Sequence, residues 1–307
     1  MATGERAPGG KISDADVAGG GGRRWDDLNR DLLVAIFGRL GVADLIAGVP
    51  FVCSSWRDAA RDPLCWRELD FREWEPLSRR LGAHGDDHAD FTGILHSVIA
   101  RGHQLLKSIY FPFFADDIDL LYVYPINFLC ENSCPGLHYF SLPNPEMDEE
   151  MFRKAVGKLA FLRGMAVDEN LIRSEVLLHV NQCCASLKEL SVFSEFVDED
   201  MASVICKSLP SLRKLEITES VISSQAIITF IDGLKELEHF DISGYENSAI
   251  TDVVLQKASR LKVFIWNSRF ELGEFMDCSN CGEDWLLQRS CECMLDRKVM
   301  EWLTELS

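Results

Sequence analysis

The chain has 307 residues, of which 47% are hydrophobic and 26% charged, so it is long enough to bury a substantial core in two units. Its net charge of -18 at pH 7 and its pI near 4.8 argue against nucleic acid and against an anionic membrane as partners. No apolar run approaches the roughly 18 residues that a membrane-spanning helix needs.

Residues 1–22 are rich in glycine and poor in bulky side chains. Such a segment buries too little surface to offset the entropy of ordering it, so we expect a disordered arm. The arm has no apolar stretch, which argues against a secretory signal. The 11 cysteines are odd in number and are therefore expected to be reduced thiols, in the cytoplasm or the nucleus or both.

Residues 23–70 predict three short helices with a very small core. The first begins at Asp26 or Asp27 as N-cap and ends at Gly41, and the others cover residues 44–49 and 51–60. The first helix carries an apolar stripe with spacings of three and four residues: Leu28, Leu32, Leu33, Ile36, Phe37 and Leu40. So much apolar surface on so small a unit requires a cover, from the following domain or from a partner.

The same stretch carries a spaced motif beyond the helical stripe. It comprises Asp44-Leu45, then Val52-Cys53-Ser54-Ser55-Trp56-Arg57, then Asp62-Pro63-Leu64-Cys65-Trp66. In this order the residues resemble the F-box family. The resemblance implies binding to a Skp-type adaptor and, through it, to cullin and RING subunits of a ubiquitin ligase.

Residues carried over from the resemblance as adaptor-binding are Leu28, Leu32, Leu33, Ile36, Phe37, Leu40, Leu45, Val52, Cys53 and Trp56. Asn29 stands where the family usually has proline, so weaker docking with an unchanged fold is expected. Trp56 and Trp66 are expected to tie the helices together and to the next domain. The alternative interpretation is a three-helix cap that closes the end of a repeat domain.

Residues 71–105 are interpreted as a connecting segment and a first repeat. A stretch from His84 to Asp90 holds two histidines and three aspartates. It is either a metal site or a solvated acidic loop in which Asp90 caps the next helix, and the second interpretation is favoured.

Residues 106–267 contain a repeated pattern in which a leucine is followed by apolar residues three and five positions later. The leading leucines are separated by 31 residues once and then by 24 or 25: Leu106, Leu137, Leu162, Leu187, Leu212, Leu237 and Leu261. This period is typical of leucine-rich repeats. The predicted fold class is therefore α/β, a solenoid with parallel strands on its concave side and helices on its convex side. Trp66, Leu69 and Phe71 share the spacing, so the helical unit is expected to lead directly into a first strand.

Between the strands, helices are expected to start at Asp148, at Glu169 or Asn170, and at Asp198, Ser223 and Thr251. One position, three residues before each leading leucine from Leu137 to Leu261, is occupied by Cys134, Leu159, Cys184, Leu209, Leu234 and Ala258. Cysteine that alternates with leucine and alanine indicates a buried packing position rather than a reactive or disulfide-forming one. The arrangement resembles the cysteine-containing repeats that follow F-boxes, especially in plants.

The concave face is predicted from strand alternation, because the residues that flank each central apolar position point away from the core. The candidate target-binding residues on it are Tyr110, Tyr139, Ser141, Glu189, Ser191, Glu216, His239, Asp241 and Ile265. Their chemistry suggests a target protein with a basic segment next to an apolar anchor. Ordinary solvated strand residues are an equally weighted interpretation.

Residues 268–307 break the repeat and are interpreted as a C-terminal cap. Four of their cysteines, Cys278, Cys281, Cys291 and Cys293, have spacings that could hold a zinc ion. The second pair is tighter than usual, so free cysteines and no cofactor are the favoured interpretation.

The sequence lacks the glycine-rich and serine-containing motifs that mark common classes of enzyme. The function is therefore predicted from the helical unit and the repeats together. The prediction is a non-catalytic substrate-recognition subunit of an SCF-type (Skp–cullin–F-box) E3 ubiquitin ligase. Its partners would be the adaptor and a target protein, with neither nucleic acid nor a membrane. The alternatives are a non-degradative F-box and repeat scaffold and, with less support, a zinc-dependent enzyme that uses the C-terminal cysteines.

Overall fold

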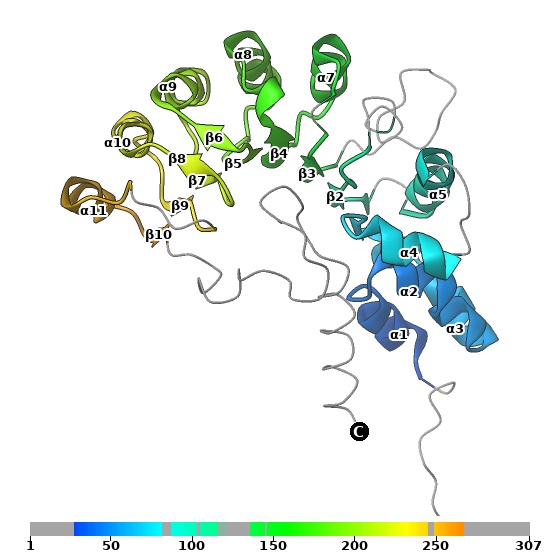
Figure 1. The fold of residues 1–307 in the computed structure, drawn as a ribbon. Coiled ribbons are helices and arrows are strands. Elements are labelled where there is room, and N and C mark those ends of the chain that lie inside the picture. Colours follow the sequence, from blue (N-terminus) through cyan, green and yellow to red (C-terminus); the bar gives the residue numbers. More distant parts are fainter. Residues whose placement is uncertain are drawn as a thin grey trace, which may run out of the picture.

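A computed structural model describes residues 28–81, 87–102, 105–115, 119, 136–144, 146–244 and 249–266. In these ranges the chain forms an arc, with a row of strands on its inner side, helices on its outer side and a bundle of short helices at its N-terminal end (Figure 1). The strands form a parallel sheet in the order β1-β2-β3-β4-β5-β7-β9-β10. The solenoid and the expected α/β class are confirmed.

The described elements fall into three groups: the bundle, the strands of the large sheet, and the helices and short strands that lie between those strands in the sequence. The N-terminal bundle contains α1 (Arg30–Phe37), α2 (Val42–Ala47), the 3-10 turn η2 (Val49–Phe51), α3 (Ser54–Ala60) and the 3-10 turn η3 (Pro63–Trp66). The sheet contains β1 (Glu68–Asp70), β2 (Ser108–Tyr110), β3 (Tyr139–Leu142), β4 (Gly164–Asp168), β5 (Glu189–Phe193), β7 (Lys214–Glu216), β9 (His239–Asp241) and β10 (Val263–Ile265). The remaining elements are α4 (Trp74–Leu81), α5 (Asp87–Gly102), α7 (Glu149–Val156), η5 (Glu169–Leu171), α8 (Ser174–Cys183), β6 (Phe196–Val197), α9 (Glu199–Ser208), β8 (Val221–Ile222), α10 (Ser224–Gly233) and α11 (Asp252–Ala258). Every helix within the described ranges falls short of the length and hydrophobicity that a bilayer crossing requires.

The first helix starts later than predicted, and its N-cap is Asn29. The Asn29 Oδ1 atom accepts a hydrogen bond of 2.8 Å from the backbone N–H of Asp31, which satisfies one of the unpaired donors at the helix start. The expected cap at Asp26 or Asp27 was wrong, because an asparagine side chain directly before the helix does this task. The helix also ends at Gly38 rather than at Gly41.

Asn29 therefore has a structural role at the position where the F-box pattern usually has proline. Replacing Asn29 by alanine removes the cap and should lower the free energy of unfolding by about 1 kcal/mol. Asn29→Asp keeps an oxygen acceptor in the same place and should leave it nearly unchanged. Urea denaturation of both variants tests this; an unchanged free energy of unfolding in Asn29→Ala would show that the cap contributes nothing.

Trp66 joins the bundle to the repeats. Its side chain is fully buried, its Nε1–H donates a 2.8 Å hydrogen bond to the Ala60 carbonyl, and the Arg101 guanidinium of α5 lies 5.2 Å from its ring centroid. β1 follows immediately and pairs in parallel with β2, with Leu69 opposite Ile109. The prediction that the helical unit leads directly into a first strand, with Trp66 at the junction, is confirmed.

The repeats stack in matching register, so that each central apolar residue lies opposite the next. Phe140, Met165, Leu190, Leu215 and Phe240 are all buried in this row, and together they form the inner part of a continuous core.

Four of the predicted helix caps are confirmed, because the side chains of Asp148, Asp198, Ser223 and Thr251 each accept a hydrogen bond from the first turn. The prediction at Glu169 or Asn170 was wrong. A 3-10 turn occupies those residues and α8 begins after Arg173. Asp90 is not a cap either, since α5 already begins at Asp87.

The position that alternates cysteine with aliphatic residues is buried wherever it is described. Leu159, Cys184, Leu209, Leu234 and Ala258 are 0–5% exposed, which confirms the prediction of a packing position. Burial raises the pKa of the Cys184 thiol to about 12, so the thiolate that reacts or binds metal is suppressed. Cys134 lies outside the described residues.

Candidate partner-binding surfaces

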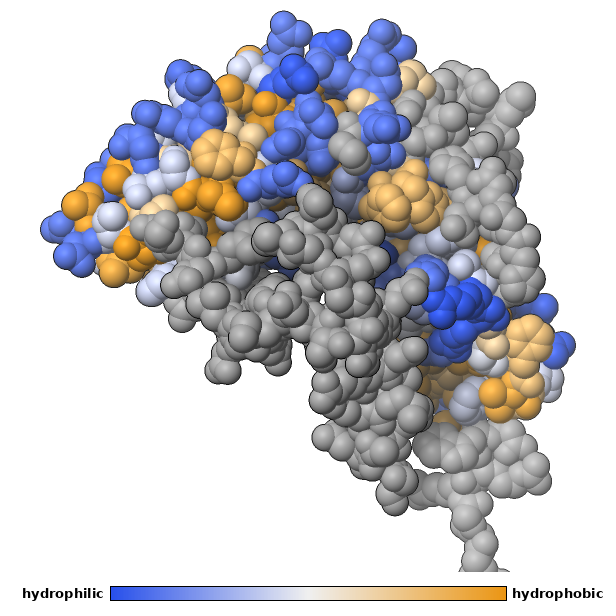
Figure 2. All heavy atoms as spheres, in the orientation of Figure 1, coloured by the Kyte–Doolittle hydropathy of each residue, from blue (hydrophilic) through white to orange (hydrophobic). Residues whose placement is uncertain are grey.

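The N-terminal bundle exposes large apolar side chains that its own core leaves uncovered. Leu32 and Ile36 on α1 are 50% and 39% exposed, Phe51 at the end of η2 and Val52 directly after it are 76% and 59% exposed, and Leu64 on η3 is 49% exposed. We call these five residues the bundle surface. Figure 2 shows apolar side chains gathered at the end of the molecule that the bundle occupies. An apolar group of this kind is characteristic of a protein-binding site.

Three residues expected to contact an adaptor directly are buried inside the bundle instead. Leu33, Phe37 and Leu45 are 0–1% exposed and fill the core between the helices. Their apolar stripe faces the inside because three short helices need nearly all of it to form any core. They shape the bundle from within and are not part of its exposed surface.

The other predicted adaptor residues differ in accessibility. Leu32, Ile36 and Val52 belong to the bundle surface, whereas Leu28, Leu40, Cys53 and Trp56 are partly buried. The Trp56 ring packs edge-on against Phe37 at 5.2 Å between centroids, which gives it the expected role of tying helices together. Phe51 and Leu64 were not predicted. The signal was present, since both are large apolar residues beside a proline that lie outside the helical stripe.

The concave face begins with a cluster of aromatic and charged side chains. Tyr110 and Tyr139 on adjacent strands lie with ring centroids 5.3 Å apart. The Arg72 guanidinium lies 4.7 Å from the Tyr110 ring centroid and pairs with Asp70 at 2.6 Å. Arg72 was not predicted, because it follows the first strand and lies outside the repeating pattern.

Gly164 on β4 provides the room in which the Tyr139 ring lies. A Cβ atom at this position would come within 2.8 Å of Tyr139 Cδ2 and 2.9 Å of Glu189 Cβ, closer than real contacts. The tyrosine is partly buried here, and burial raises the pKa of Tyr139 to about 12 despite a hydrogen bond with Ser191. The hydroxyl therefore stays protonated at physiological pH and remains a hydrogen-bond donor.

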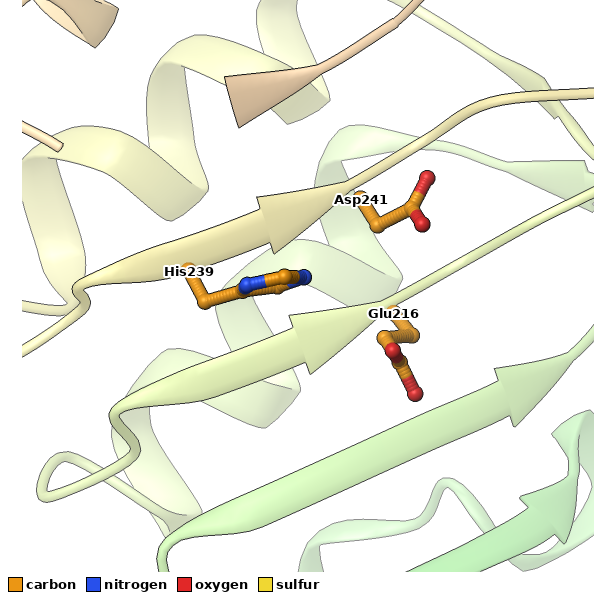
Figure 3. A group of neighbouring side chains, drawn as sticks. All are labelled: Glu216, His239 and Asp241. Carbon is orange, nitrogen blue, oxygen red and sulfur yellow. The ribbon is translucent and has the colours of Figure 1, made fainter. Parts of the chain in front are cut away.

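The middle of the concave face is acidic and internally connected. Ser191 Oγ donates to Glu216 Oε2 at 2.7 Å, and Lys214 Nζ pairs with Glu216 Oε1 at 2.9 Å. Glu216 on β7 and His239 and Asp241 on β9 bring one side-chain donor atom each within 4.8 Å of one another. Figure 3 shows the imidazole of His239 directed toward the space beside both carboxylates.

Most predicted concave residues are at least partly accessible. Tyr110, Tyr139, Glu189, Ser191, Glu216 and His239 are partly exposed, and Ile265 on the last described strand is 38% exposed. Ser141 and Asp241 are only 3% exposed, so the prediction of an open contact surface was wrong for these two. Asp241 accepts a hydrogen bond of 2.9 Å from the backbone N–H of Ser243, which holds its carboxylate against the end of the strand. Cys278, Cys281, Cys291 and Cys293 lie outside the described residues.

The N-terminal bundle is similar to a known family of domains. The F-box-like family matches residues 25–72, which contain every helix of the bundle and β1. The leucine-rich repeats follow this domain along the chain. The chain thus combines an F-box-like domain with leucine-rich repeats.

Relatives from Arabidopsis thaliana match most of this chain. One F-box/LRR-repeat protein is 26% identical over 266 residues, which cover 79% of this chain and 84% of the relative. F-box protein SKIP19 is 26% identical over 71% of this chain and 68% of its own. Putative F-box/LRR-repeat protein 23 is also 26% identical, over 72% of this chain but only 48% of its own length.

Proposed function

We propose that the chain is the substrate-recognition subunit of an SCF-type E3 ubiquitin ligase. Its F-box binds a Skp-type adaptor, through which cullin and RING subunits are recruited, and its repeats bind a target protein. The chain itself performs no chemistry. It raises the local concentration of the target beside the ubiquitin-loaded enzyme.

The bundle surface is the observation that carries this proposal. Five large apolar side chains at 39–76% exposure surround the turns of a domain that matches the F-box-like family. Buried apolar anchors at the centre of an interface supply most of its binding energy. Because the domain is small, few of its other surfaces could form a stable interface with a partner.

The target-binding part of the proposal is supported by the concave face. Glu189 and Glu216 provide carboxylates near Tyr139, and Ile265 provides an apolar side chain at the far end of the sheet. A target with a basic segment next to an apolar anchor would match this order. The overall charge of -18 favours encounter with such a segment.

Reconstitution tests the proposal. The full chain is mixed with a purified Skp-type adaptor and passed over a size-exclusion column, and cullin and RING subunits are then added. We expect a stable binary complex that recruits the other two subunits. Absence of a binary complex would refute the assignment, whereas an adaptor complex that excludes cullin would identify a scaffold without ligase function.

A further inference from the structure

We propose that Glu216, His239 and Asp241 form a binding site for a divalent transition-metal ion of the zinc class on the concave face. The site is independent of the adaptor-binding proposal, because it lies on β7 and β9 rather than on the N-terminal bundle. It is also distinct from the C-terminal cysteines.

The sheet itself places the three side chains together. Glu216 and Asp241 are direct partners in the parallel register of β7 and β9, and His239 lies two residues before Asp241 on the same side of its strand. Their donor atoms lie within 4.8 Å of one another. Ligands of a tetrahedral zinc are about 3.4 Å apart, given metal–ligand bonds of about 2.0–2.1 Å. Rotation of the Glu216 side chain, which is 28% exposed, can close the difference.

The imidazole supplies a second, independent observation. His239 Nε2 is shielded from solvent and has no hydrogen-bond partner within the described part of the chain. A buried polar atom in this state costs free energy unless something pairs with it. A metal ion bound at the edge of the ring would satisfy the nitrogen, and the two carboxylates beside it would compensate the charge of the ion (Figure 3).

The donor set indicates which class of ion fits. Calcium and magnesium prefer oxygen ligands only, whereas zinc and its neighbours accept one imidazole together with carboxylates. Three protein ligands leave at least one position for water or for another ligand. Lys214 Nζ at 2.9 Å from Glu216 Oε1 occupies one lone pair of this carboxylate, and its side chain is 36% exposed, so it is free to turn away when an ion arrives.

The experiment uses zinc alone as the probe and the full chain as the protein. A chain in which Cys278, Cys281, Cys291 and Cys293 are serine removes thiolates that could bind zinc elsewhere. After chelator treatment it is dialysed against zinc chloride, and bound metal is measured by mass spectrometry. We expect about one zinc per chain. Adding Glu216→Gln or His239→Gln should weaken binding by about tenfold or more, since even losing an outer partner of a ligand has an effect of about this size.

Two further variants separate a metal site from a general effect of charge or folding. Glu189→Gln removes a carboxylate from the same face, on β5, and should leave zinc affinity within about twofold. Lys214→Met removes the cationic competitor for Glu216 and should strengthen zinc binding. A zinc titration of the wild-type chain, followed by the NMR signal of the His239 Cε1 proton, gives a readout that needs no cysteine replacement. The signal is assigned by its loss in His239→Gln. An unmoved signal, or zinc affinity that is unchanged in Glu216→Gln and His239→Gln, would overturn the proposal.

Discussion

Replacing Ile36 or Phe51 by aspartate is expected to weaken binding of a Skp-type adaptor strongly while leaving the fold intact. Both side chains are exposed, at 39% and 76%, so a carboxylate in either place remains in water in the free protein. In the complex it would be buried without a partner. Each change should cost about 2 kcal/mol or more of binding free energy, the size seen at interface hot spots, which is roughly a thirtyfold loss of affinity. Isothermal titration calorimetry with the purified adaptor measures it.

Two control variants make this result specific. Leu178→Asp introduces the same charge at an apolar residue that is 44% exposed on α8, in the repeats, and should bind the adaptor normally. Leu33→Asp, by contrast, places a charge in the core and should unfold the bundle, so its loss of binding would carry no information about the interface. Wild-type affinity in both Ile36→Asp and Phe51→Asp would show that the bundle surface is not the docking site.

Replacing Trp66 by alanine should produce the largest loss of stability. The change empties a fully buried site, removes the hydrogen bond to the Ala60 carbonyl and leaves the Arg101 guanidinium without its aromatic neighbour. Truncation of a buried aromatic residue costs about 3–5 kcal/mol. We therefore expect the urea midpoint of the full chain to fall sharply, with the bundle separating from the first repeat.

The neighbouring Leu64 is the matched control for Trp66. It belongs to the same 3-10 turn but is 49% exposed, so Leu64→Ala should change stability by less than about 1 kcal/mol. Trp66→Phe should recover part of the loss, because it refills most of the volume without restoring the hydrogen bond. If Trp66→Ala and Leu64→Ala were equally stable, Trp66 would not hold the two units together.

Local patterns were sufficient to predict the repeating part of the fold. The leucine spacing of 24 or 25 residues determines where each strand lies, because every repeat must place its apolar edge against the next one. Aspartate, serine and threonine side chains determine most helix starts by capping the first turn, as at Asp148 and Ser223. The packing role of Cys184 also followed from the aliphatic residues that occupy the equivalent position in other repeats.

Tertiary packing decided the details that no local pattern contains. An apolar stripe predicts one buried face, but it does not say how wide that face is. Packing of α1 against its neighbours is what buries Leu33 and Phe37 and leaves Ile36 accessible. The placement of the turn that carries Phe51 decides that this side chain is exposed.

The concave face divides in the same way between sequence and structure. Strand alternation alone identified Glu216, His239 and Asp241 as neighbours on one side of the sheet. The register of β7 against β9 then decided that their donor atoms lie within 4.8 Å of one another, and packing at the strand end buried Asp241. Periodicity is a property of consecutive residues and can be read from the sequence. Register and burial depend on residues that are distant in the sequence, and only the folded chain brings these together.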